Sequence, residues 1–292
     1  MKPAPFKYHD PQSLSELLGL TATLEDAKIL AGGQSLMPMM NMRFVTPDDL
    51  VDINKITELD FIELEEGHLK IGAMTRQKDI VSSEKIFSVA PIIQEALLNV
   101  GHMQTRNRGT LGGSLCHLDP AAELPAIAHL YGATMFVENK DGRREVSIDD
   151  WSLAYMIPNL APEDILTSIS IPIWGADHGY SFIEFARRHG DFAICAAGVL
   201  IKIDSSSKIV KVAITVAGAD IKPTRLIELE KKLIGHEANE IVFLEAEEEA
   251  KKIVAISDAY YTAAYRKRLS GTLVKRALRI ATSRAGGSHR NG

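Results

Sequence analysis

Two short glycine-rich motifs constrain this 292-residue chain more than any other feature. The first motif follows a compact apolar run and consists of Ala31, Gly32, Gly33, Gln34, Ser35 and Leu36. The second motif consists of Thr110, Leu111, Gly112, Gly113 and Ser114. Glycine has no Cβ, so it readily adopts positive φ and lets consecutive backbone N–H groups turn toward an anion. Neither motif contains Lys or Arg, so two such loops would hold a pyrophosphate mainly through backbone amides and hydroxyl groups.

A plainer interpretation of each motif stays open, because a single Gly-Gly pair after a strand is usually only a tight turn. Neither motif matches the G-x-G-x-x-G pattern of dinucleotide-binding folds or the G-x-x-x-x-G-K-[ST] pattern of phosphate loops. A Rossmann or P-loop fold is therefore disfavoured.

The composition is that of an ordinary globular protein, with 46% hydrophobic and 24% charged residues. The net charge of −5 gives no basic footprint for nucleic acid or an anionic membrane. We see no apolar signal segment at the N-terminus and no membrane span, so we expect a cytoplasmic protein. Cys116 and Cys195 are the only cysteines, which excludes a disulfide framework and a self-contained iron–sulfur or zinc site. We nominate no metal ligand and no catalytic residue.

Hydrophobic periodicity predicts an α+β fold in two parts. In the first part we expect a helix opened by Ser13 and Glu16, buried strands over 27–31 and 50–53, and a hairpin around Gly67. We also expect a helix that is opened by residues 119–123, with a proline in its first turn, and that runs to residue 131. After a boundary near 174–178, three strands are expected over 180–187, 193–203 and 208–218. Helices over 224–233, 237–255 and 257–282 follow. The polar tail, residues 283–292, is expected to fray.

Four segments together resemble one family. These are AGGQSLMP at 31–38, RNRGTLGGS at 106–114, DPAAELPA at 119–126 and GDFA at 190–193. They resemble the FAD-binding medium subunit of molybdenum hydroxylases of the carbon monoxide, quinoline, nicotine and methylxanthine dehydrogenase type. The FAD domain of xanthine dehydrogenase is similar, and the likeness covers the whole chain.

The resemblance implies a fold and domain boundaries. It implies a two-lobed FAD-binding domain of the vanillyl-alcohol-oxidase (PCMH) type over residues 1–176, with lobes of about 1–56 and 57–176. A C-terminal domain over 177–292 would combine a three-stranded antiparallel sheet with a helical bundle.

The resemblance also implies site residues. FAD would be held non-covalently, with both glycine motifs around its diphosphate and ribityl chain. Glu123 matches an acid near the adenosine ribose, although it stands where the xanthine dehydrogenase domain has Asp. It could equally be a first-turn helix acid. Phe192 matches an aromatic residue against the flavin ring, and the alternative is that it plugs an edge of the C-terminal sheet.

Several residues near the second motif keep two interpretations. Arg106 and Arg108 could clamp a phosphate, but we favour a solvated or intersubunit role for both. His102 and His117 could be mistaken for covalent flavin attachment points, but the resemblance implies non-covalent FAD, so we favour packing for both. Cys116 is interpreted as a small core residue.

In function, the resemblance implies that this chain performs no hydroxylation itself. The resemblance implies a small partner subunit with 2Fe–2S clusters and a large molybdopterin subunit, assembled as a dimer of heterotrimers. Electrons would pass through the clusters to FAD and on to an external acceptor. The alternatives are a free-standing flavin oxidoreductase of the same fold and a non-catalytic nucleotide-binding module.

Overall fold

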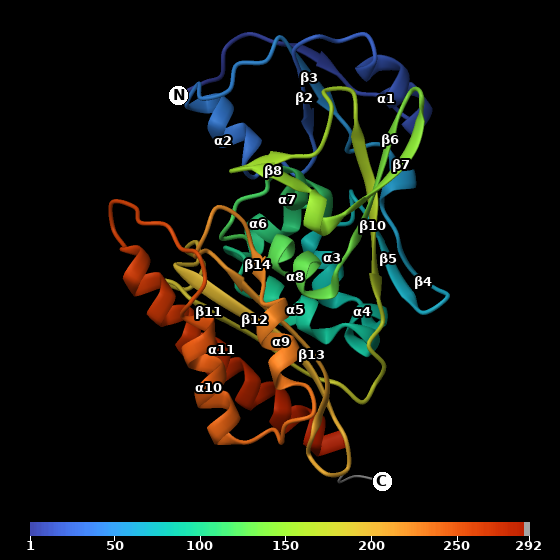
Figure 1. Ribbon diagram of the computed structural model, residues 1–292. Coiled ribbons are helices and arrows are strands. Elements are labelled where there is room, and N and C mark those ends of the chain that lie inside the picture. Colours follow the sequence, from blue (N-terminus) through green and yellow to red (C-terminus); the bar gives the residue numbers. More distant parts are fainter. Residues whose placement is uncertain (289–292) are drawn as a thin grey trace.

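The computed structural model describes residues 1–288, which form two lobes and a C-terminal layer around four sheets (Figure 1). The first lobe, at the top of Figure 1, is a three-stranded parallel sheet in the order β1-β3-β2. Its strands are β1 (Lys7–His9), β2 (Ala27–Leu30) and β3 (Asp49–Asp52). Because β2 ends at Leu30, it delivers the first glycine motif to the end of this sheet.

Two helices and a short 3-10 turn complete the first lobe: α1 (Leu14–Thr21), α2 (Leu36–Asn41) and η1 (Thr57–Leu59). The Ser13 side chain accepts from the Glu16 N–H and caps α1, and the Glu16 carboxylate accepts from the Gln12 N–H. The expected helix start at Ser13 is confirmed, and the cap stabilises the first turn of α1.

The second lobe is a five-stranded antiparallel sheet with helices packed on one face. The strand order is β4-β5-β10-β6-β7, with bounds β4 (Ile62–Glu65), β5 (His68–Gly72), β6 (Thr134–Asn139), β7 (Gly142–Ser147) and β10 (Ile165–Pro172). The helices are α3 (Gln77–Ser82), α4 (Glu84–Val89), α5 (Pro91–Leu97), α6 (Met103–Arg108), α7 (Leu111–His117) and α8 (Glu123–Tyr131). Every second residue of the central strands faces these helices. On β5 these residues are Leu69 and Ile71, and on β6 they are Met135 and Val137; all four belong to the largest hydrophobic cluster.

A short hairpin lies beside α7 and below α2 in Figure 1. It consists of β8 (Ser152–Ala154) and β9 (Ile157–Pro158), and it follows the 3-10 turn η2 (Ile148–Asp150).

The C-terminal layer is an antiparallel sheet covered on both faces. Its strands are β11 (Gly179–Phe185), β12 (Cys195–Ile203), β13 (Ile209–Ala217) and β14 (Thr224–Arg225), in that order. Its helices are α9 (Ile227–Leu233), α10 (Glu240–Ala250) and α11 (Ala263–Ser288). Ala196 and Leu200 face the cluster that contains α8, whereas Val199 and Ile201 face the cluster under α10 and α11. The sheet is therefore sandwiched between the second lobe and the C-terminal helices (Figure 1).

The structure corrects several sequence-based expectations. Residues 111–117 form helix α7 instead of a loop, because Thr110 caps them by accepting from the Gly113 N–H at 3.0 Å. Residues 224–225 form a fourth, two-residue strand instead of the start of a helix. The last long helix begins at Ala263 instead of 257, and it continues to Ser288 through the part of the expected tail that is described. The C-terminal sheet therefore has four strands instead of the three expected, and α10 occupies only residues 240–250 of the expected range 237–255.

Candidate functional site

The fold brings the two glycine motifs together. A Cβ on Gly32 would lie 2.3 Å from the carbonyl oxygen of Arg108, two residues before Thr110. A Cβ on Gly113 would lie 3.8 Å from the Cβ of Ala31. Gly32 is therefore required by a close approach of two backbones, and the two motifs line one place between the lobes.

The first motif carries a run of open hydrogen-bond donors. Within the described residues, the N–H groups of Gly32, Gly33, Gln34 and Ser35 have no acceptor. Gly32 is buried, Gly33 and Ser35 are half-buried, and Gln34 is exposed. Gly33 has φ +73, a conformation that favours glycine. Buried backbone donors in folded proteins are nearly always paired. An unpaired run of this kind fits a bound anion such as a diphosphate.

The second motif differs, because its backbone donors are used inside the chain. The N–H of Leu111 donates to the Thr75 carbonyl oxygen at 3.0 Å, and that of Gly112 donates to the Ala73 carbonyl oxygen at 2.8 Å. A Cβ on Gly112 would lie 2.7 Å from the Ala73 Cβ, so this glycine serves packing. The hydroxyl of Ser114 has no partner in the described chain, so it is the group this motif has left to offer a ligand.

The side chains of Asn54 and Arg76 form a polar bridge between the two motifs, on the side of their carbonyl groups. The sequence analysis did not predict this bridge. Asn54 donates to the Ala31 carbonyl oxygen at 2.9 Å, and its own oxygen accepts from Arg76. The guanidinium of Arg76 also donates to the Arg108 carbonyl oxygen. Asn54 stands two residues beyond β3, and a polar side chain just after a buried strand is a signal that would have pointed to it.

Glu123 opens α8 and meets Glu184 of β11, so the acid predicted from the sequence faces a second acid from the C-terminal layer. Burial, first, and then the neighbouring carboxyl raise the pKa of Glu184 to about 8. Burial raises the pKa of Glu123 to about 7. Glu184 shares the core-facing side of β11 with Phe182. A charged residue on the apolar face of a strand is the signal that would have singled it out.

Phe192 lies in the turn between β11 and β12 and is 74% exposed. Such exposure does not fit the alternative in which it plugs the edge of the sheet. The turn itself is anchored to the second lobe, because a Cβ on Gly190 would lie 3.0 Å from the Gly101 carbonyl oxygen. Phe192 is thus an exposed aromatic ring on an anchored turn.

The basic residues near the second motif have separate environments. Arg106 donates to the Val100 carbonyl oxygen at 2.8 Å, which ties its side chain to the end of the preceding helical region. Arg108 is exposed. Burial acts to raise the pKa of Asp52, but hydrogen bonds from Asn54 and Tyr8, together with the charge of Arg108, lower it. His117 is half-buried, and burial lowers its pKa. Burial raises the pKa of Cys116 to about 12, which fits an unreactive packing residue.

Among residues 1–288 no group of side chains could hold a metal ion.

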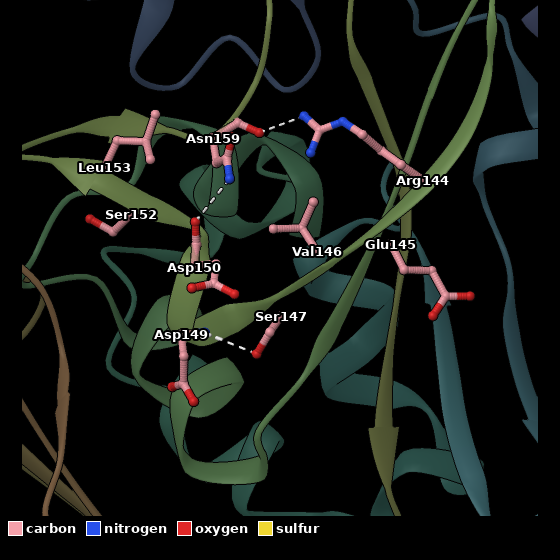
Figure 2. A pocket seen from close by; sticks show the side chains of 9 residues that line it. All are labelled: Arg144, Glu145, Val146, Ser147, Asp149, Asp150, Ser152, Leu153 and Asn159. Atoms are coloured by element: carbon pink, nitrogen blue, oxygen red, sulfur yellow. Dashed lines mark hydrogen bonds between the residues drawn. The ribbon is translucent and has the colours of Figure 1, made fainter.

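A polar pocket of about 510 Å³ lies away from both motifs, between β7, η2 and the β8–β9 hairpin (Figure 2). Arg144 and Asn159 face each other across its rim, and Arg144 also pairs with Asp164 at 2.7 Å. No residue predicted from the sequence lines this pocket.

Comparisons with known proteins agree with this geometry. Residues 4–174 match the family model described as the FAD binding domain in molybdopterin dehydrogenase. Residues 180–281 match the CO dehydrogenase flavoprotein C-terminal domain. The chain is 36% identical to the caffeine dehydrogenase subunit beta of Pseudomonas sp. (strain CBB1), over 97% of each protein. It is 34% identical to the carbon monoxide dehydrogenase medium chain of Afipia carboxidovorans, over 98% of this chain and 99% of the relative.

A solved structure shows the same architecture. Quinoline 2-oxidoreductase from Pseudomonas putida 86 superposes with a TM-score of 0.93 at 32% identity, over 98% of this chain and 99% of that one. Fold and site thus define the class of oxidoreductase subunits that carry an FAD-binding domain. Within that class, this chain belongs to the medium-subunit family of molybdopterin dehydrogenases. The residues present fit FAD, since the open donors of the first motif match what a diphosphate requires. No helix among residues 1–288 is long and apolar enough to cross a membrane.

Proposed function

We propose that this chain binds FAD non-covalently between its two lobes and relays electrons from 2Fe–2S clusters of a partner subunit to an external acceptor. The observation that carries the proposal is the run of open N–H groups in the first motif, set against the second motif. When bound, the flavin supplies the redox chemistry, and the protein supplies binding, orientation and electrostatics.

The residues that would hold the cofactor are those predicted from the sequence. Gly32, Gly33, Gln34 and Ser35 would bind the diphosphate through backbone N–H groups, flanked by Ala31 and Leu36. Thr110, Leu111, Gly112, Gly113 and Ser114 would form the opposing wall, with Ser114 contributing its hydroxyl. Glu123 would accept from a hydroxyl group of the cofactor, and Phe192 would cover the flavin ring.

The partners in this proposal are a small subunit with 2Fe–2S clusters and a large molybdopterin subunit, assembled as a dimer of heterotrimers. Two clusters require about eight cysteine thiolates. This chain has two cysteines, so the clusters would belong to a partner.

The proposal includes a domain division. Lobes of about 1–56 and 57–176 would form an FAD-binding domain of the vanillyl-alcohol-oxidase (PCMH) type, followed by a C-terminal domain over 177–292. The separate parallel and antiparallel sheets support the two lobes, and the independent sheet from β11 to β14 supports the last boundary.

The test is to purify the full chain alone and measure FAD content after gel filtration, then turnover of an N-heterocycle with a dye acceptor. We expect about one FAD per chain and no turnover. Addition of the small and large subunits should restore turnover and reduce the bound flavin. Turnover by the isolated chain would instead support a free-standing flavin oxidoreductase.

A further inference from the structure

Asn54 and Arg76 connect the carbonyl sides of the two glycine motifs. The Asn54 amide uses both of its functions: Nδ2 donates to the Ala31 carbonyl oxygen at 2.9 Å, and Oδ1 accepts from the Arg76 guanidinium. Another guanidinium nitrogen of Arg76 donates to the Arg108 carbonyl oxygen, just before the second motif. One amide and one guanidinium therefore link the first lobe to the second.

Each end of this bridge is itself fixed. The Asn54 N–H donates to the Asp52 carboxylate at 2.9 Å, and the same carboxylate accepts from the Tyr8 hydroxyl at 2.7 Å. On the other side, the segment that carries Arg76 pairs with the second motif. The N–H of Gln77 donates to the Gly109 carbonyl oxygen at 2.9 Å, and Arg76 and Thr110 form an isolated antiparallel bridge.

The geometry of the peptide group gives this bridge a consequence for the open donors. In a trans peptide the C=O and N–H groups point in opposite directions. The Ala31 carbonyl points toward Asn54, so the Gly32 N–H of the same peptide points away from Asn54. A rotation of this peptide would instead turn a carbonyl oxygen toward a bound diphosphate and repel it.

We propose that Asn54 and Arg76 are positioning residues for the FAD diphosphate, holding the Ala31–Gly32 peptide so that the N–H groups of the first motif face the cofactor. This inference rests on the proposed function. Neither residue needs to touch FAD, because both act through the backbone.

The charge of Arg76 strengthens the same effect. Both motifs lack Lys and Arg, and the Arg106 side chain is tied to the Val100 carbonyl oxygen. Arg76 places a cation directly behind the first motif, where part of its side chain is buried. Burial and the neighbouring Arg108 lower its pKa, while Asp52, Asp60 and Asp79 act in the opposite direction. An arginine remains protonated in such surroundings, so the positive potential is permanent. Its planar fork also allows two separate oxygens to be bound at once.

The experiment measures FAD affinity, thermal stability and the ³¹P NMR shift of the bound diphosphate in the full chain. The variants are Arg76→Gln, Asn54→Ala and their combination. Asn54→Asp is added because it keeps an acceptor for Arg76 but removes the donor to Ala31. Arg143→Gln is the matched control, since it removes an exposed arginine that pairs with Glu138 on the β6–β7 hairpin.

We expect each single change at the bridge to weaken FAD binding by about tenfold and to move the ³¹P shift of the bound diphosphate. The control Arg143→Gln should keep the FAD affinity and the ³¹P shift of the wild-type chain. The double variant should lose no more than about twofold beyond the weaker-binding single variant, because both changes break one bridge. Asn54→Asp should lose at least as much affinity as Asn54→Ala.

Three results would overturn the inference. These are unchanged affinity in Arg76→Gln, fully additive losses in the double variant, or weaker binding with an unmoved ³¹P shift, which would indicate a merely structural link. If Arg76→Gln does not fold, the two Asn54 variants carry the same test. A wild-type chain that binds no FAD contradicts the proposed function itself, whereas a wild-type chain that binds FAD no better than the variants contradicts only the bridge.

Discussion

At the scale of single residues, Gly33 combines two requirements. Its φ of +73 is strained for any residue with a Cβ, and its N–H belongs to the open run of donors. Gly67 shares only the first requirement, because it has φ +82 in the β4–β5 turn and nothing within 4 Å of an added Cβ. Substitutions at Gly33 and Gly67 therefore distinguish the effect of backbone strain from the effect of lost ligand binding.

Gly33→Asp should abolish retention of FAD, because the new carboxylate would stand beside the diphosphate and repel it. Gly67→Asp should keep full FAD occupancy. Both variants should lose about 1–2 kcal/mol of unfolding free energy to left-handed strain. Flavin absorbance after gel filtration and urea unfolding measure the two effects. Full FAD occupancy in Gly33→Asp would show that the first motif does not face the diphosphate.

Phe192→Ala tests the exposed ring on the β11–β12 turn. Since the side chain is 74% exposed, its removal should change the melting temperature by less than about 2 °C. If the ring covers the flavin, the loss of stacking, worth about 0.5–1.5 kcal/mol, should raise flavin fluorescence and speed the reaction of the reduced chain with oxygen. Unchanged fluorescence together with unchanged oxygen reactivity would remove the shielding role.

At the scale of elements, the two similar glycine motifs have different structural roles. The first stays an irregular turn with open donors, whereas the second becomes the first turn of α7 and packs on the end of β5. Gly112 matters because an added Cβ would lie 2.9 Å from the Ala73 carbonyl oxygen, which is backbone and has little freedom to move.

Gly112→Ala should therefore destabilise the chain by about 1–3 kcal/mol through overpacking. Gly19→Ala is the control: it lies within α1 with nothing within 4 Å of an added Cβ, and it should stabilise by about 0.5–1 kcal/mol. Urea unfolding at neutral pH measures both changes. A neutral Gly112→Ala would mean that α7 can move away from β5.

The elements also show how far the sequence could predict the fold and the site. The Ser13 cap, the hairpin at Gly67 and the long strands of the C-terminal layer depend on local patterns, so they were predictable. The helical start of the second motif has one local signal, the Thr110 cap, but the carbonyl oxygens that accept from its first N–H groups belong to Thr75 and Ala73, in a distant part of the chain. No local pattern around Thr110 reports such partners. The meeting of Glu123 with Glu184 likewise depends on domain packing.

At the scale of the whole molecule, the sheet from β11 to β14 has no solvated face. Its one face shares the large cluster with α5 and α8, and its other face packs on α10 and α11. A residue on the face that packs on α5 and α8, such as Glu184, therefore lies between the second lobe and the C-terminal layer. The Glu184 Oε2 atom is buried and has no partner within the described residues, apart from its proximity to Glu123.

Two carboxyl groups in contact at this seam share a proton, because burial disfavours their charged forms, Glu123 further raises the pKa of Glu184, and Asp119 adds negative charge near Glu123. The pair therefore titrates as a unit. Its folded pKa values of about 7 and about 8 lie above the usual 4.5 of a glutamate. The native state consequently holds a proton that the unfolded chain has already released at neutral pH.

Glu184→Gln should reduce this dependence on pH, because one of the two buried acids no longer titrates. For a raised pKa, the stabilisation is complete below about pH 4.5 and is lost as pH rises to about 8, so the free energy of unfolding of the wild-type chain should fall across that window. A glutamine amide can donate to Glu123 without a proton from solvent, so the variant should show a flatter curve and be about 1–3 kcal/mol more stable than wild type at pH 8. Glu63→Gln, on the exposed face of β4, is the control and should follow the wild-type curve. Urea unfolding at pH 5, 6, 7 and 8 measures all three proteins, and parallel curves for Glu184→Gln and wild type would show that the two acids do not share a proton.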